Sequence, residues 1–442
     1  MNMTPKQIVA YLDDYIIGQK EAKKTIAIAL RNRYRRMQLE QELQDDIMPK
    51  NILMIGSTGV GKTEIARRMA KMMNLPFIKV EASKYTEVGY VGREVESMIK
   101  DLAHEAYNLV TKEYEKKIQH SIDEEVIRQI VEILVPPLPD TASDSAKESF
   151  IKTYNLMEKK VIDGEMDDKK ITIELPKTTH VEIIDSGLPM DMSVISDSIS
   201  NVLGKIGKDK VKKEVTIKEA KKLLRGIAKD NLLDKDSLKA EAVKRCENGG
   251  IIFLDEIDKI ATGNTNKSQE PSKEGVQRDL LPIVEGSSVH TKYGQVKTDH
   301  ILFIAAGAFH VSKPSDLLPE LQGRFPLRVE LNPLDEDDLY AILTSTKTSL
   351  LKQYQALLGV EGVDLQFTDE AIRAFARLSV SANEKAEDIG ARRLHTVIEK
   401  VLDDISFEAD EHSGETITIE EDLVVEKLED IAQNEDTARY IL

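Results

Sequence analysis

Residues 56–63 read Gly56-Ser57-Thr58-Gly59-Val60-Gly61-Lys62-Thr63 and fit the pattern G-x-x-x-x-G-K-[ST]. Glycines in such a loop let backbone N–H groups point at phosphate oxygens, and the helix that follows presents its positive N-terminal end to the same anion. The lysine then reaches the β- and γ-phosphates, and the last hydroxyl ligates Mg²⁺. The stretch therefore predicts that this chain binds ATP and Mg²⁺.

The flanks of this loop decide the fold class. Residues 51–55 form a nearly continuous apolar run, which is typical of a parallel strand covered on both faces. The residues after Lys62 repeat apolar side chains at helical spacing. Further strands are predicted at 76–80, 251–254 and 301–306, with helices between them. Strands that alternate with helices predict an α/β domain with a parallel, doubly wound sheet.

Two adjacent carboxylates follow the strand at 251–254. Asp255 stands at the end of that strand, where a carboxylate that ligates the metal belongs. Glu256 comes next and is placed to orient and polarise an attacking water. Acidic residues often simply end strands, but together with the phosphate loop this pair predicts hydrolysis.

Composition restricts the classes of protein. The chain has 442 residues, a formal net charge of -17 and one cysteine, Cys246. The acidic balance argues against nonspecific binding of nucleic acid backbones, and a single cysteine forms neither an internal disulfide nor a cysteine-based zinc site. The first residues lack a signal peptide, and no apolar run has the length of a membrane span. We therefore expect a cytoplasmic protein.

Length and composition predict three domains. Residues 110–242 are rich in Lys, Glu and Asp and separate the second strand from the third, so we expect an inserted, mostly helical intermediate domain there. The nucleotide-binding domain is then discontinuous, with residues 1–109 and 243–332. After Asn332-Pro333 the pattern changes, and residues 333–442 predict a small, mainly helical C-terminal domain.

Three other features are ambiguous from the residues alone. Gly89-Tyr90-Val91-Gly92 predicts either a mobile loop that presents an aromatic side chain or a core tyrosine in a tight turn. Arg324 and Arg392 are permanently charged and grip phosphate well, but surface arginines are common.

In order along the chain, Gly18-Gln19, the phosphate loop, Asp255-Glu256 and Gly390-Ala391-Arg392-Arg393 resemble the Clp/Hsp100 branch of AAA+ ATPases. The likeness narrows to the ATPase subunits of bacterial complexes whose peptidase is a separate threonine peptidase. It rests on the long insertion and on the segments Glu87–Gly92, Glu274–Pro282 and Arg439–Leu442. It covers nearly the whole chain and is weakest in residues 110–242.

The resemblance implies a role for individual residues. Ile17 would contact adenine, Asp255 would ligate Mg²⁺ together with Thr63, and Glu256 would activate water. Arg392 would read the γ-phosphate, while Glu320 and Arg324 would be offered to the nucleotide of a neighbouring subunit in a hexameric ring. The phosphates would be held by Gly59, Val60, Gly61, Lys62, Thr63 and Glu64.

The resemblance also implies a mechanical function. Tyr90, with Val91, would be the pore-loop residue that grips an unfolded substrate, and Tyr440-Ile441-Leu442 would dock between peptidase subunits. The chain itself would carry no peptidase site. A link to stress responses is implied by the resemblance alone. The sequence departs from many AAA+ proteins at Ala305-Ala306-Gly307-Ala308, where they place a polar sensor-1 residue, so we assign none.

Other functions stay open at this point. A DNA-remodelling AAA+ motor is disfavoured by the acidic balance. A ClpX-like unfoldase for the ClpP peptidase is disfavoured because such chains usually begin with a Cys-rich zinc module, whereas this sequence starts at the nucleotide domain. An adaptor that binds ATP without hydrolysing it is disfavoured by Glu256.

Overall fold

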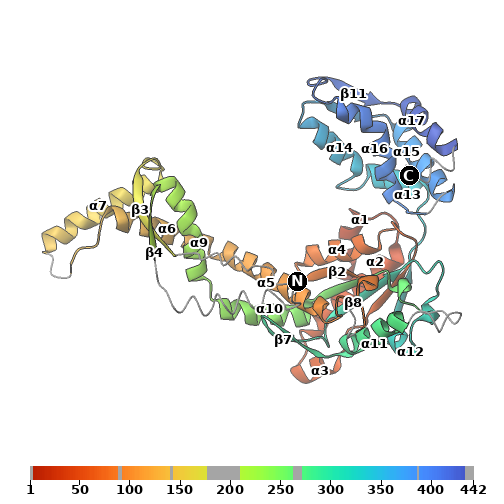
Figure 1. The fold of residues 1–442 in the computed structure, drawn as a ribbon, viewed down its shortest axis with the longest axis horizontal. Coiled ribbons are helices and arrows are strands. Elements are labelled where there is room, and N and C mark those ends of the chain that lie inside the picture. Colours follow the sequence, from red (N-terminus) through yellow and green to blue (C-terminus); the bar gives the residue numbers. More distant parts are fainter. Residues whose placement is uncertain are drawn as a thin grey trace. The chain divides into compact units, whose positions relative to one another are not determined.

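A computed structural model of the chain describes residues 3–87, 92–139, 143–176, 210–261, 271–385 and 388–433. The chain divides into two compact units (Figure 1): the first combines residues 1–106 with 242–442, and the second comprises residues 107–241. Two helices cross the boundary between them, α5 (Ser97–Lys117) and α10 (Lys235–Gly249).

A five-stranded parallel sheet forms the centre of the first unit. Its strands, in spatial order, are β2 (Phe77–Glu81), β5 (Ile251–Asp255), β8 (Leu302–Gly307), β1 (Ile52–Ile55) and β9 (Leu327–Glu330). This confirms the predicted parallel α/β architecture. Since all the strands are parallel, the segments that follow β1 and β5 leave the sheet at the same edge.

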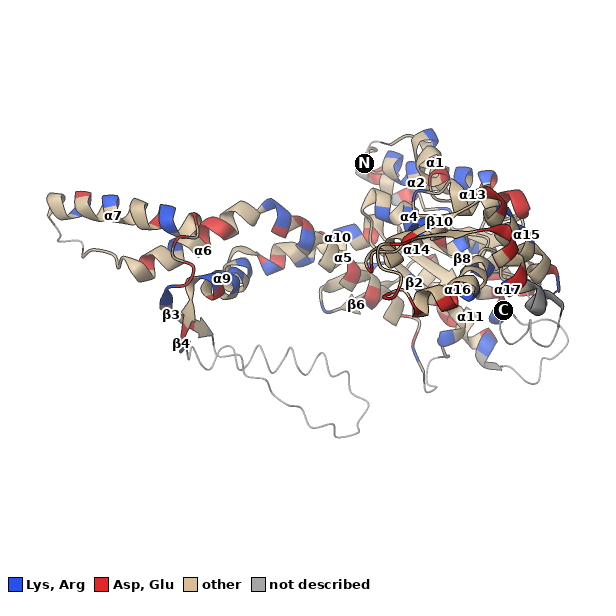
Figure 2. Cartoon of the chain, turned by 90° about the horizontal axis from the view of Figure 1, so that it is seen from above, with Lys and Arg blue, Asp and Glu red and all other residues tan. Residues whose placement is uncertain are grey.

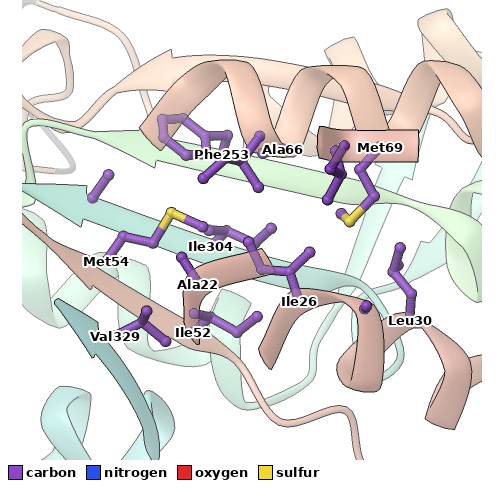
Figure 3. Close-up of a cluster of buried hydrophobic side chains, with 14 of the residues drawn as sticks. Ala22, Ile26, Leu30, Ile52, Met54, Ala66, Met69, Phe253, Ile304 and Val329 are labelled. Atoms are coloured by element: carbon purple, nitrogen blue, oxygen red, sulfur yellow. The ribbon is translucent and has the colours of Figure 1, made fainter. Parts of the chain in front are cut away.

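Helices α1 (Pro5–Asp13), α2 (Lys20–Arg36) and α4 (Lys62–Met73) pack on one face of this sheet. Figure 3 shows Phe253 of β5 beside Ala66 of α4, and Ile304 of β8 beside Ile26 of α2. The apolar residues of each strand alternate between the two faces, so every second one enters this cluster. Burial of these side chains fixes α4, and with it the phosphate loop, against the sheet.

The sequence predicts one helix over roughly residues 19–44, and this prediction is wrong as a single element. Helix α2 ends at Arg36, and a separate α3 (Gln41–Asp46) follows. The Arg36 side chain is buried, and its Nε donates a hydrogen bond to the Gln44 carbonyl oxygen at 2.6 Å. This bond folds the chain back on itself, which helical periodicity does not reveal.

The remaining described elements of the first unit fall before and after residue 333. Before it lie η1 (Ala82–Lys84), η2 (Ile257–Lys259), α11 (Pro271–Glu285), the hairpin of β6 (Ser288–Thr291) and β7 (Gly294–Lys297), η3 (Pro314–Asp316) and α12 (Pro319–Arg324). After it lie α13 (Glu336–Thr344), α14 (Leu350–Gly359), β10 (Asp364–Phe367), α15 (Asp369–Lys385), α16 (Arg392–Phe407), β11 (Thr416–Ile419) and α17 (Glu421–Gln433). The helices after residue 333 bury their own hydrophobic cluster. The sequence predicts that a helix starts at Asp369 with Thr368 as its N-cap. The Thr368 Oγ1 accepts from the Ala371 N–H, which confirms this cap of α15.

In the residues that the structure describes, the second unit is mainly helical and contains an antiparallel pair of strands. The described elements are α6 (Gln119–Leu134), α7 (Asp144–Ile162), β3 (Lys170–Pro176), β4 (Lys210–Thr216) and α9 (Ile217–Leu232). Strands β3 and β4 pair antiparallel, and Ile171, Ile173 and Val215 are buried in the cluster of this unit. This strand pair has no local signal in the sequence, because the two strands lie on either side of a long polar stretch.

Among the residues that the structure describes, no helix is long and apolar enough to cross a membrane.

A buried arginine fastens α2 to the start of the central strands. The Arg33 Nη1 donates to the Gly250 carbonyl oxygen at 3.0 Å and to that of Gly249 at 3.4 Å. Its Nη2 donates to the carbonyl oxygens of Asn248 at 3.0 Å and His300 at 2.7 Å. The first three carbonyls end α10 or lead into β5, and the last precedes β8. One guanidinium thus joins α2 to three other elements, α10, β5 and β8.

We expect the substitution Arg33→Met to lower the free energy of unfolding by about 3 kcal/mol, since it removes the four hydrogen bonds by which the buried guanidinium holds these elements together. Urea titration followed by circular dichroism measures this loss. Arg35→Met is the matched control, because Arg35 is exposed on the same helix, and we expect it to change stability by no more than about 0.5 kcal/mol. Equal effects of the two substitutions would contradict the role given to Arg33.

Candidate nucleotide-binding site

The loop after β1 has the backbone that its glycines permit. Gly59 and Gly61 have φ values of +80° and +101°, in the region that favours glycine. Lys62 is the first residue of α4, and its Nζ donates to the carbonyl oxygens of Gly56 at 2.5 Å and Ser57 at 2.7 Å. Burial lowers the pKa of the Lys62 ammonium, and Asp255 and Asp258 partly offset this. A bound phosphate would favour the charged form of this lysine further.

A cavity of about 400 Å³ opens beside this loop, which is large enough for a small ligand. Its wall brings together residues from the N-terminal segment, the phosphate loop, β5 and the C-terminal helices. The lining residues are Tyr15, Ile16, Ile17, Thr58, Gly59, Val60, Gly61, Lys62, Thr63, Glu64, Asp255, Glu256, Leu334, Ile342, Ala391, Arg392 and His395. The structure thus places Ile17, the loop 59–64, Asp255, Glu256 and Arg392 around one space.

The metal ligands predicted from the sequence lie close together. The Thr63 Oγ1 is 3.5 Å from Asp255 Oδ2. The same Asp255 oxygen forms an ion pair with Lys79 Nζ at 2.7 Å. Among the described residues no group of three or more His, Cys, Asp or Glu side chains could hold a metal ion. A hydroxyl and a single carboxylate do fit Mg²⁺, because this ion keeps several waters and takes its other oxygens from phosphates.

Glu256 has a strained backbone. Its φ of +56° lies in the left-handed region, which costs a non-glycine residue about 1 kcal/mol or more. The Oε2 of its carboxylate accepts a hydrogen bond from the Ser83 hydroxyl at 3.1 Å. Together the backbone turn and Ser83 direct this carboxylate, and such strain is typical of functional positions.

The turn before α16 lies directly on the phosphate loop. The Ala391 N–H donates to the Gly59 carbonyl oxygen at 3.3 Å. A Cβ atom on Gly59 would lie 1.9 Å from the Ile389 carbonyl oxygen, and one on Gly390 would lie 2.7 Å from that of Thr58. Glycine at both positions therefore allows the backbone contact that brings Arg392 to the cavity.

The N-terminal segment 14–19 is tied at both ends to residues that follow the central sheet in the chain. The Gln19 amide donates to the Asn332 carbonyl oxygen at 2.8 Å and accepts from the Asn332 N–H at 3.1 Å. At the other end, Lys347 forms an ion pair with Asp14 at 2.6 Å. Tyr15 lies between these ties, and the Arg68 guanidinium makes a cation–π contact with its ring, 4.3 Å from the ring centre.

Sequence reasoning missed part of the cavity wall. Tyr15, Leu334, Ile342 and His395 line it, and none was predicted. Two of them had a local signal: Tyr15 lies two residues before Ile17, and His395 follows Arg392 by three residues, which is one helical turn. Leu334 and Ile342 had none, because they reach the site only through tertiary packing.

Two predicted residues lie away from this cavity. Glu320 and Arg324 are exposed on α12. The Arg324 Nε and Nη2 donate to Glu285 Oε1 at 3.0 and 2.8 Å. The predicted pore-loop residues Tyr90 and Val91, and the predicted docking residues Tyr440, Ile441 and Leu442, fall outside the residues that the structure describes.

Comparisons with known proteins agree with this geometry. Residues 52–159 match the model of the ATPase family associated with various cellular activities (AAA), and residues 168–328 match that of an AAA domain of the Cdc48 subfamily. An ATP-dependent protease ATPase subunit HslU from Helicobacter pylori is 60% identical over 443 residues, covering 100% of this chain and 99% of that protein. The protein of the same name from Campylobacter jejuni is 61% identical over 444 residues, covering all of both chains. The chain is an ATP-binding AAA ATPase and belongs to the HslU family.

Proposed function

We propose that this chain unfolds protein substrates with the energy of ATP hydrolysis and passes them into the threonine peptidase HslV (ClpQ), which it activates. It would thus be the ATPase subunit of a proteasome-like degradation complex in the cytoplasm. The observation that carries the proposal is the convergence of Lys62, Thr63, Asp255, Glu256 and Arg392 on one cavity. The names of the similar proteins, each an ATPase subunit of an ATP-dependent protease, support a protease partner.

Each residue of the cavity has a task in hydrolysis. Lys62 would hold the β- and γ-phosphates, Thr63 and Asp255 would hold Mg²⁺, and the ion would neutralise developing negative charge. Glu256 would orient a water molecule and take its proton. Arg392 would contact the γ-phosphate, so that the position of α16 depends on the nucleotide. The apolar side chains of Ile17 and its neighbours would surround the adenine.

A ring supplies residues that one subunit lacks at its own cavity. In a homohexamer, Glu320 and Arg324 would face the nucleotide of the neighbouring subunit, which agrees with their exposure away from this cavity. An arginine that acts in trans can raise the rate on the order of 10³-fold. Tyr90 and Val91 would grip the substrate in the central pore, and Tyr440-Ile441-Leu442 would dock on HslV.

The charge distribution does not favour a DNA-remodelling motor. The formal net charge is -17, and Figure 2 shows Lys and Arg interspersed with Asp and Glu along helices of both units. A groove that follows a nucleic acid backbone needs a basic surface. We therefore propose neither nucleic acid nor a membrane as a partner.

The substitution Glu256→Gln tests the role of this carboxylate. The amide keeps the size of the side chain but cannot accept a proton, so we expect ATP hydrolysis to fall by roughly 10²-fold or more while ATP stays bound. Phosphate release and binding of radiolabelled ATP measure the two effects. Glu421→Gln is the control, because Glu421 pairs with Arg377 in the C-terminal part of the chain. Hydrolysis by the Glu256→Gln variant at the normal rate would exclude this role.

The substitution Tyr90→Ala tests the pore-loop assignment. Loss of the ring should slow ATP-dependent unfolding of a folded fluorescent substrate about tenfold, which corresponds to one aromatic contact. Tyr90→Phe keeps the ring and should unfold the substrate at nearly the normal rate. Intact unfolding by Tyr90→Ala would mean that Tyr90 does not grip the substrate.

Removal of Tyr440-Ile441-Leu442 tests the partner. We expect the full-length chain with ATP to stimulate cleavage of a small fluorogenic peptide by purified HslV, and the truncated chain to lose this stimulation while keeping its ATPase activity. Failure of the full-length chain to activate HslV would remove this partner. Parallel reactions with ClpP, and ATPase assays with DNA, would then show which alternative holds.

A further inference from the structure

One side chain in α15 bridges the turn that precedes α16. The Asn383 Oδ1 accepts hydrogen bonds from the Ile389 N–H at 3.3 Å and from Arg393 Nε at 3.2 Å. Its Nδ2 donates to the Gly390 carbonyl oxygen at 3.2 Å. Both polar atoms of the Asn383 amide thus form hydrogen bonds with the turn before α16 or with the first turn of that helix. Asn383 is half-buried, so water competes only partly for these bonds.

The turn that Asn383 holds is the one that docks on the phosphate loop. Gly390 adopts a φ of +57° and lies against the backbone of Thr58 and Gly59. The Asp388 Oδ1 accepts from the Gly390 N–H at 3.0 Å and supports the same conformation. Because this is a contact between two backbones, a small shift of Gly390 separates the two loops or makes them collide.

Two consecutive arginines leave this turn in different environments. Arg392 is exposed and lines the cavity, whereas Arg393 is only 1% exposed. Since neighbouring residues of a helix point about 100° apart, the direction of Arg392 is set by how the buried Arg393 is anchored. Asn383 is an anchor of that buried guanidinium.

We propose that Asn383 is a positioning residue for ATP hydrolysis: it fixes the turn 388–391 and the first turn of α16 so that Arg392 reaches the phosphates. The inference rests on the proposed role of Arg392. Loss of the Asn383 amide removes an acceptor of the buried Arg393 guanidinium. It also removes the two hydrogen bonds to the backbone of Ile389 and Gly390, and polar groups that lose their partners in this way destabilise the local structure. The expected result is a displaced Arg392 in a protein that otherwise folds.

A double-mutant cycle tests the proposal in the full-length chain. We compare Asn383→Ala, Arg392→Ala and the double variant by kcat and KM for ATP and by the temperature of unfolding. We expect Asn383→Ala to lower kcat/KM about tenfold, and the double variant to lose no more than Arg392→Ala alone, because both changes remove the same contact. Gln355→Ala is the matched control, since the Gln355 amide also donates to a backbone carbonyl, that of Leu365, outside the nucleotide cavity.

The outcomes separate this inference from the function on which it rests. If Arg392→Ala lowers kcat/KM but Asn383→Ala equals Gln355→Ala, Asn383 does not position Arg392, and the proposed function stands. Losses that multiply in the double variant would show a merely structural role and would also overturn the inference. If Arg392→Ala loses nothing, the role of Arg392 and the inference fail together. Should Asn383→Ala not fold, Asn383→Ser, whose shorter hydroxyl cannot make all three bonds, enters the same cycle and is judged by the same criteria.

Discussion

The site depends on one constraint, the parallel pairing of β1 and β5 with β8 between them. Parallel strands end at the same edge, so the phosphate loop after β1 and the carboxylates after β5 meet although they lie far apart in the chain. Hydrophobic burial on α1, α2 and α4 stabilises the sheet and directs α4. Thr63 at the start of α4 is then brought within 3.5 Å of Asp255. Packing thus produces a site that no local segment could form.

The sequence predicted the parts of this arrangement that have a local signal. The strands were visible because apolar runs are bounded by the loop at Gly56 and by Asp255, and the phosphate loop was visible because its spacing is rarely met by chance. The cap at Thr368 and the short strand that Thr416-Ile417-Thr418-Ile419 predicts follow from equally local patterns, and the structure has both. The roles of individual site residues beyond these placements came from resemblance to a family.

The remaining features depend on contacts between distant residues. Leu334 and Ile342 line the cavity only because the C-terminal helices lie beside it. The break after Arg36 depends on a side chain bonding to Gln44, and β3 pairs with β4 although more than thirty residues separate the two strands in the sequence. The spacing of apolar residues indicates which side chains are buried, but it does not indicate which other residues they contact. These features therefore could not be predicted from the sequence.

The two ties of segment 14–19 have a mechanical consequence. The Gln19 amide bonds twice to the backbone of Asn332, where the chain leaves the sheet. At the other end of the segment, the Lys347 N–H donates to the Asp14 carbonyl oxygen at 2.9 Å, and the Lys347 ammonium adds an exposed ion pair with the Asp14 carboxylate. The segment is thus anchored at both ends to backbone groups of the chain that runs from the sheet into the C-terminal helices. Because Ile17 and Leu334 line the same cavity, an expansion of that cavity would strain both anchors together and would act on residues 332 and 347 as a pair.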